Sequence, residues 1–135
     1  MQQDKLTIVI PRESLTDTAL ENLQKITVNK QTLFQRAFRM DSTEIEIIDE
    51  KINFTWFPYT VDGDDIAAYT QFISRLCDMA RDAKRVSSKP TETDNDKYAF
   101  RCFLLRLGFI GKEYKTARKI LLRNLTGNSA FRYGE

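Results

Sequence analysis

The sequence TEIEIIDEKINFTWF, residues 43–57, predicts a two-stranded antiparallel hairpin over 44–57. Apolar and polar side chains alternate on both sides of Asp49 and Glu50, and such alternation is typical of strands that bury one face. The Asp49–Glu50 pair lies between the two alternating runs, where it can form a tight turn. We therefore expect helices to pack against the apolar face of this hairpin.

A strand and two helices are predicted before the hairpin. The run KLTIVI, residues 5–10, is rich in β-branched residues and is followed by a proline, so it predicts a strand. Ser14 can cap a helix, with Asp17 in the acidic position of a capping box. The β-like stretch ITVNK, residues 26–30, then interrupts the helical spacing. We interpret it as a break before a second helix over 31–40, and a single strand over 25–29 is the alternative.

Three helices are predicted after the hairpin. The strongest pattern is DGDDIAAYTQFISRLCDMARDAKRV, residues 62–86, in which acidic residues crowd the start and basic residues the end, as the helix dipole favours. A polar loop over 87–96 leads to a second helix, capped by Asp94 or Asp96, that ends at the first glycine of GFIG. A final helix is predicted over 112–125.

Together these elements predict a single globular α+β domain over 1–135. A small antiparallel sheet, made of the hairpin 44–57 and the strand 5–10, packs under helices in the order β-α-α-β-β-α-α-α. With 135 residues, 41% of them hydrophobic, the chain is long enough to bury an ordinary core. The polar loop 87–96 precedes the C-terminal helical hairpin.

The composition argues against the familiar hydrolases and metalloenzymes. The chain contains no histidine, which removes the commonest general base and zinc ligand. Cys77 and Cys102 fall in apolar helical patterns, so we expect reduced thiols rather than a disulfide. The acidic stretch 62–65 has the composition of a calcium loop, but Ile73 stands where a bidentate glutamate is needed, so helix capping is expected. No phosphate-binding glycine motif occurs. We expect no enzyme, no cofactor and no metal.

The sequence also predicts a cytoplasmic protein. No run of about 18 apolar residues occurs, so we expect no membrane partner. The apolar run near the N-terminus is short and lacks the features of a signal peptide.

The charge is divided unevenly along the chain. Residues 1–95 carry a net charge of −4 and residues 96–135 a net charge of +6, which favours an anionic partner for the C-terminal part. On a helical wheel, four basic side chains of the final helix fall opposite its apolar side. The candidate phosphate-contacting residues are Lys112, Lys115, Lys119, Arg123, Arg101 and Arg132. They favour non-specific contacts with a nucleic-acid backbone. A solvated charged face is the competing interpretation.

Two aromatic residues in FTWFPY are candidates for a protein interaction. Trp56 and Tyr59 would serve as anchors if their rings are exposed. The competing interpretation is that Trp56 packs under the helices.

Three stretches of the chain resemble small bacterial virulence-related, or virulence-associated, proteins of conjugative transposons and other mobile elements. They are FTWFP, AYTQFISRLCDMARDAKR and DNDKYAFRCFLLRLGFIGKEYKTARKILLRNLTGNSAFR. The likeness is dense from Trp56 to Arg132 and looser from Lys5 to Phe54. The resemblance implies no catalytic residue or ligand, and it implies that the chain is the C-terminal domain of a longer protein.

The sequence predicts a regular globular fold but no set of residues that could form a catalytic site. We therefore expect a non-enzymatic accessory or protein-interaction domain of a bacterial mobile element. Its expected partner is a protein, whose identity the sequence does not specify. The alternative is a nucleic-acid-binding module that uses the basic C-terminal helical hairpin.

Overall fold

The computed structural model describes residues 5–89 and 93–127 and confirms the predicted α+β class and element order. Within these residues three strands and five α-helices form, with two short 3₁₀-helices between them. In chain order the elements are β1 (Lys5–Pro11), η1 (Arg12–Ser14), α1 (Asp17–Asn29), α2 (Gln31–Phe38), β2 (Glu46–Ile48), β3 (Lys51–Pro58), α3 (Gly63–Asp82), α4 (Asp96–Leu107), η2 (Lys112–Tyr114) and α5 (Lys115–Leu122).

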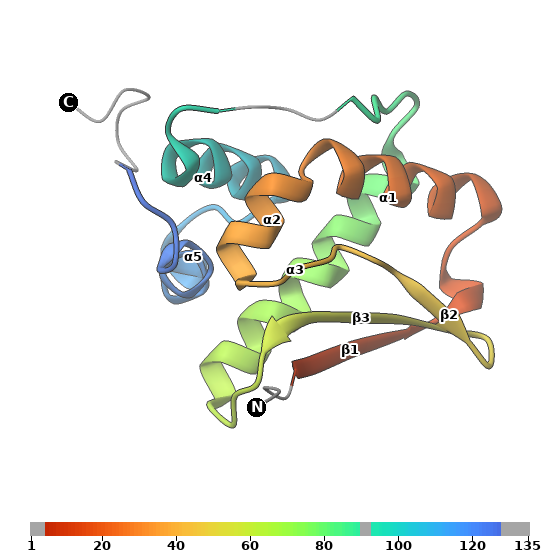
Figure 1. Cartoon of the computed structure of the whole chain (residues 1–135), viewed down its shortest axis with the longest axis horizontal. Coiled ribbons are helices and arrows are strands. Elements are labelled where there is room, and N and C mark those ends of the chain that lie inside the picture. The colour runs from red at the N-terminus through yellow and green to blue at the C-terminus, as the bar shows by residue number, and fades with distance from the viewer. Residues whose placement is uncertain (1–4, 90–92, 128–135) are drawn as a thin grey trace.

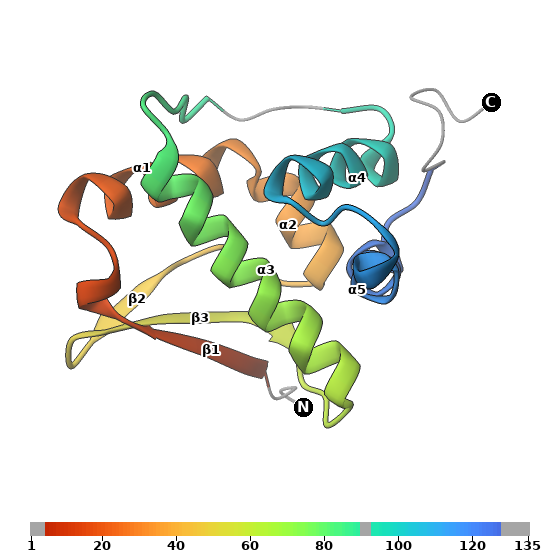
Figure 2. The ribbon, with the colours of Figure 1, turned by 180° about the vertical axis from the view of Figure 1, so that it is seen from behind.

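The three strands form one antiparallel sheet in the order β1-β3-β2. Ile52 of β3 lies opposite Ile10 of β1 and Ile47 of β2, so the hairpin pairs as predicted and the N-terminal strand joins its far side. The strands lie along one side of the molecule and α1, α2 and α4 along the other, with α3 running diagonally between them (Figures 1 and 2). The buried side chains of the sheet therefore face helices, as expected.

An aromatic cluster joins the sheet to the helices. Phe34 of α2 lies at its centre and is fully buried. Its ring centroid is 5.7 Å from that of Trp56 on β3, 5.5 Å from that of Phe72 on α3 and 6.1 Å from that of Phe100 on α4. One side chain thus contacts the sheet and two further helices, and most of these ring pairs have the tilted or edge-on geometry that aromatic rings prefer.

The long helix α3 begins and ends with side-chain caps. The carboxylate of Asp62 accepts hydrogen bonds from the backbone N–H groups of Asp64 and Asp65, so this acidic stretch caps a helix, as predicted. At the other end, the buried amide of Asn22 on α1 donates to the carbonyls of Ala80 and Ala83, both at 3.1 Å. These bonds satisfy carbonyls that the helix end leaves unpaired, and they fix α1 against α3.

The predicted helix–break–helix is confirmed, but the break is confined to Lys30, and the alternative strand over 25–29 is wrong. The helix α1 continues to Asn29, because Leu23, Ile26 and Thr27 are buried at helical spacing. The burial of this face outweighs the β propensity of the segment. The cap is also displaced from Ser14 to Thr16, whose hydroxyl accepts from the N–H of Ala19.

Two predictions about the C-terminal helices need correction. The cap of α4 is Asn95, whose side-chain oxygen accepts from the N–H of Tyr98, rather than Asp94 or Asp96. The final helix is shorter than 112–125, because its first turn is the 3₁₀-helix η2. The predicted end of α4 is confirmed by Gly108, which has a left-handed backbone with φ of 106°.

The turn of the hairpin is strained. Asp49 and Glu50 have φ angles of 51° and 61°, so both central residues of the two-residue turn are left-handed. Turns of this kind match the twist of the strands, but a left-handed backbone costs roughly 1–2 kcal/mol for a residue other than glycine.

Replacement of this turn by Asp49→Asn with Glu50→Gly should therefore stabilise the protein by about 1 kcal/mol, since Asn-Gly is the sequence that this turn favours. Urea denaturation measures the free energy of unfolding. The control is Asp49→Ala with Glu50→Ala, which keeps the left-handed strain. An equal stability of the two variants would show that the turn stores no such strain.

Candidate functional site

The three lysines predicted to contact phosphate are exposed, and they lie in η2 and α5. Lys112 lies in η2, and Lys115 and Lys119 lie in α5. Within residues 5–89 and 93–127, no carboxylate forms an ion pair with any of them. Arg101 belongs to α4 rather than to α5, and it is half-buried. Arg132 lies outside the described residues.

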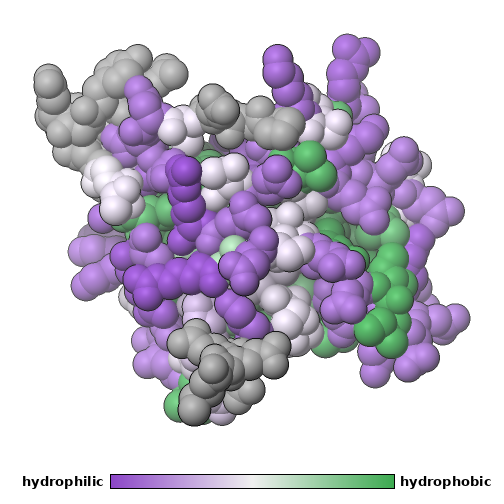
Figure 3. Space-filling model, in the orientation of Figure 1, coloured by the Kyte–Doolittle hydropathy of each residue, from purple (hydrophilic) through white to green (hydrophobic). Residues whose placement is uncertain are grey.

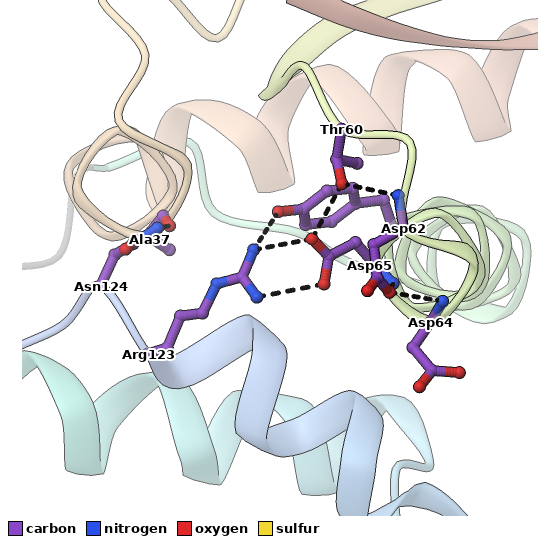
Figure 4. A network of polar contacts seen from close by, with 8 residues as sticks. Ala37, Thr60, Asp62, Asp64, Asp65, Arg123 and Asn124 are labelled. Carbon is purple, nitrogen blue, oxygen red and sulfur yellow. Dashed lines mark hydrogen bonds and ion pairs between the residues drawn. The ribbon is translucent and has the colours of Figure 1, made fainter.

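Arg123 is the fourth basic residue predicted to contact phosphate from the final helix. Its side chain instead binds other residues of the same chain. Its guanidinium donates to both carboxylate oxygens of Asp65 on α3, each at 3.1 Å, and to the hydroxyl of Tyr69 at 3.2 Å (Figure 4). Asp65 also accepts a hydrogen bond from the hydroxyl of Thr60 at 3.0 Å. The bidentate pair joins the end of α5 to the start of α3, two elements more than 50 residues apart.

This contact shifts the pKa values of its members in the directions that an ion pair requires. The hydrogen bond from Arg123 lowers the pKa of Asp65, and the same bond raises the pKa of Arg123. Burial raises the pKa of the Tyr69 hydroxyl. The side chain of Asp65 is only 13% exposed and that of Arg123 is 45% exposed, so the pair is partly shielded from solvent. Arg123 is therefore a structural residue in this fold.

The replacement Arg123→Gln should lower the free energy of unfolding by about 1 kcal/mol near neutral pH. The folded-state pKa of Asp65 is below its unfolded value, so the pair stabilises the fold fully above about pH 4 and its contribution is lost as the pH falls through the folded pKa. The difference between wild type and variant should therefore shrink in acid. Urea denaturation at about pH 7 and about pH 3 measures it.

Lys119→Gln is the matched control for this prediction, because Lys119 lies on the same helix without an ion pair among the described residues. We expect the same stability difference from wild type at both pH values in this control. If Arg123→Gln lowers the free energy of unfolding by the same amount at both pH values, the ion pair with Asp65 is not the cause of the lost stability.

Arg118 has a structural role that its place in the sequence did not indicate. Its guanidinium donates to the carbonyls of Phe109 and Gly111, both at 2.9 Å. Gly111 has a φ angle of 92°, so the chain turns sharply there between α4 and α5. Arg118 therefore stabilises this turn, and its guanidinium is not free to contact phosphate.

The two candidate interaction aromatics lie in different environments. Trp56 is fully buried and its indole N–H donates to the carbonyl of Glu44 at 3.0 Å, so its proposed role as an exposed anchor is wrong. Burial follows from its place on the inner face of the central strand, which α2 covers. Tyr59 is 61% exposed just after β3 and remains a candidate contact residue.

A further apolar surface lies at the edge of the sheet. Ile47 and Ile48 of β2 are 46% and 53% exposed, and hydrophobic side chains gather over the side of the molecule where β2 lies (Figure 3). Beside them, Val28 of α1 and Ile45 line a shallow hollow of about 450 Å³. We call Val28, Ile45, Ile47 and Ile48 the β2-edge patch.

The sequence contained one signal for this surface, although the hairpin was predicted to bury its apolar side chains. Two isoleucines follow each other at 47 and 48, so on a strand they must point to opposite faces. Ile47 lies opposite the buried Ile52, yet it is exposed because β2 is the last strand of the sheet.

The described residues hold no group of three or more cysteine, aspartate or glutamate side chains that could bind a metal ion, and none of their helices is long and apolar enough to cross a membrane. Both cysteines are free thiols, as predicted. Burial raises the pKa of Cys77 to about 11, so this thiol stays protonated at neutral pH.

Comparison of the chain with protein-family models, curated proteins and solved structures found no match.

Proposed function

We propose that this chain is a non-enzymatic accessory domain that binds a partner protein through the β2-edge patch. The observation that carries this proposal is the exposure of two consecutive isoleucines on the edge strand of the sheet. Large apolar side chains that stay exposed on both faces of an edge strand, beside polar residues, are a feature of protein interaction sites.

The edge of β2 can pair with an incoming strand. In the order β1-β3-β2, only one side of β2 is paired within the described residues, which leaves backbone groups on the other side open to an extended partner segment. The indole of Trp56 holds the carbonyl of Glu44, so the chain leading into β2 is fixed in place. Such a fixed edge lowers the entropy that binding would cost.

The opposite edge of the sheet is less suited to this role. β1 begins at Lys5, has an irregular register between Leu6 and Ile8, and ends at Pro11. A lysine, a bulge and a proline are the features that disfavour edge-to-edge pairing. β2 has none of them, although it is short. These features support β2 as the interacting edge.

The charge around the patch indicates the chemistry of the partner. Residues 41–50 contain five carboxylates and no basic side chain; they are Asp41, Glu44, Glu46, Asp49 and Glu50. All five are exposed. Opposite charges steer association and disfavour partners of the wrong sign. We therefore propose an extended partner segment in which β-branched residues alternate with lysine or arginine.

The setting of this interaction is proposed from the sequence alone. The resemblance of residues 56–132 to virulence-related proteins supports a role in a bacterial mobile element, and the short apolar run near the N-terminus supports a cytoplasmic location. It adds no residue to the proposed interface.

Selection from a library of displayed random peptides tests the interaction. We expect the wild-type chain to enrich peptides in which β-branched residues alternate with basic ones, and Ile47→Glu to lose their binding, because a carboxylate would then face an apolar side chain of the peptide without a partner. Binding of a selected synthetic peptide is then measured by NMR titration, with backbone shifts expected at 45–48.

The matched control is Val61→Glu, which places the same charge at an exposed valine outside the β2-edge patch and should leave peptide binding unchanged. Selected peptides that bind Ile47→Glu as well as wild type, or that carry a net negative charge, would contradict the proposal. Circular dichroism confirms that both variants fold.

Nucleic-acid binding is the second candidate function. It is favoured by Lys112, Lys115 and Lys119, which are exposed and form no ion pair with the described residues. Since Arg123 is held by Asp65, three of the four predicted phosphate contacts on the final helix remain. The logarithm of the binding constant should then fall against the logarithm of the salt concentration with a slope of about −3.

Fluorescence anisotropy with short duplex and single-stranded DNA, over a range of salt concentrations, tests this second function. The triple variant Lys112→Gln, Lys115→Gln, Lys119→Gln should lose most of the salt dependence, because its phosphate contacts are removed. The control removes an equal charge elsewhere, by Lys51→Gln, Lys84→Gln and Lys89→Gln. An equal loss in both triple variants would show that net charge alone acts, and absence of binding at low salt would exclude the function.

A further inference from the structure

A small pocket lies where the end of α1, the end of α3 and the helix α4 meet. Its volume is about 280 Å³. The apolar part of its wall comes from Ile26, Met79 and Phe103. Three basic side chains line the same pocket: Lys30, from the junction of α1 and α2, Arg85, which follows α3, and Arg106 of α4. The pocket shares no lining residue with the β2-edge patch.

The three cations have no anionic partner within the described residues. No carboxylate is among the residues that line the pocket, and none of the described ones forms an ion pair with Lys30, Arg85 or Arg106. Four other arginines among the described residues do pair with carboxylates; they include Arg36, which pairs with Asp96, and Arg123, which pairs with Asp65. The pocket is thus a place where positive charge accumulates without internal compensation.

Lys30 is the most constrained of the three. Its ammonium lies over the ring of Phe103, 5.6 Å from the centroid, a cation–π contact that fixes the end of the side chain. Partial burial lowers its pKa, and the charge of Arg106 lowers it further. Both effects oppose the charged form of Lys30, and the attraction of a bound anion would offset both.

The wall of the pocket is held in place by contacts that do not involve these cations. The amide of Asn29 donates to the carbonyl of Lys89 at 2.6 Å, which ties the segment after α3 to the end of α1. The amide of Asn22 fixes α1 to the end of α3 through the carbonyls of Ala80 and Ala83. The arrangement is therefore preformed, which favours binding of a small ligand.

We propose that this pocket binds a small phosphomonoester, with its phosphate among Lys30, Arg85 and Arg106 and its apolar or aromatic body against Phe103 and Met79. A phosphate dianion offers three acceptor oxygens to three cations, and arginine suits it because the guanidinium can donate two parallel hydrogen bonds. The volume fits a ligand of roughly the size of one phosphorylated ring.

NMR titration of the whole chain with phenyl phosphate tests the proposal, with inorganic phosphate and phenol as separate probes at constant ionic strength. Phenyl phosphate should give saturable shifts at 26–30, 83–87 and 103–106, and it should bind more tightly than either probe because it uses both parts of the wall. A parallel titration with adenosine 5′-monophosphate against adenosine tells whether a nucleotide body is preferred to a phenyl ring.

Two variants test the cations individually. Arg106→Gln and Lys30→Met should each weaken binding of phenyl phosphate by about tenfold or more, because each removes a charge-assisted contact. Lys51→Gln, which removes an exposed charge on β3, is the matched control and should leave the affinity unchanged.

Several outcomes would overturn the proposal. The first is the absence of saturable shifts in the wild-type chain at millimolar phenyl phosphate, a result that does not depend on the folding of any variant. The second is a set of shifts spread over all lysines and arginines, which would show only general attraction of anions. Equal affinity for inorganic phosphate and phenyl phosphate would exclude the apolar wall as part of the ligand site.

Discussion

The fold depends on the burial of Phe34 among aromatic rings from other elements. Its neighbours Trp56, Phe72 and Phe100 come from β3, α3 and α4, so a single residue of α2 joins the sheet to helices that are distant in sequence. A large aromatic side chain removes more apolar surface from water than an aliphatic one does, so each ring of this cluster contributes strongly to the core. The sheet has only three strands and relies on this helical cover for its stability.

Charged side chains act in two different ways on this framework. Arg123 and Arg118 connect segments, the first through Asp65 and the second through backbone carbonyls of the turn before α5. The cations of the small pocket, such as Lys30, have no such partner among the described residues. The same residue types therefore stabilise the fold in one place and are available to a ligand in another, and only their neighbours distinguish the two.

The secondary structure was largely predictable because its signals are local. The alternation around Asp49, the acidic cap at Asp62 and the glycine that ends α4 each depend on residues within one or two turns of the chain. One failure arose where a distant contact decided the outcome, because residues 25–29 remain helical while their apolar face packs against other elements. The displaced helix cap has a local cause: Ser14 belongs to the 3₁₀-helix η1 and donates to the carbonyl of Pro11, so Thr16 caps α1 instead.

The sequence by itself determined the α+β class, the order of the elements and the identity of most core residues, since hydrophobic periodicity encodes which face of each element avoids water. Only the tertiary structure decided which charges and apolar side chains remain free. It places Asp65 against Arg123, buries Trp56, leaves Ile47 exposed at the end of the sheet and brings Lys30 beside Arg106. Pairing of this kind depends on distances between elements far apart in the chain, and no local pattern specifies those distances.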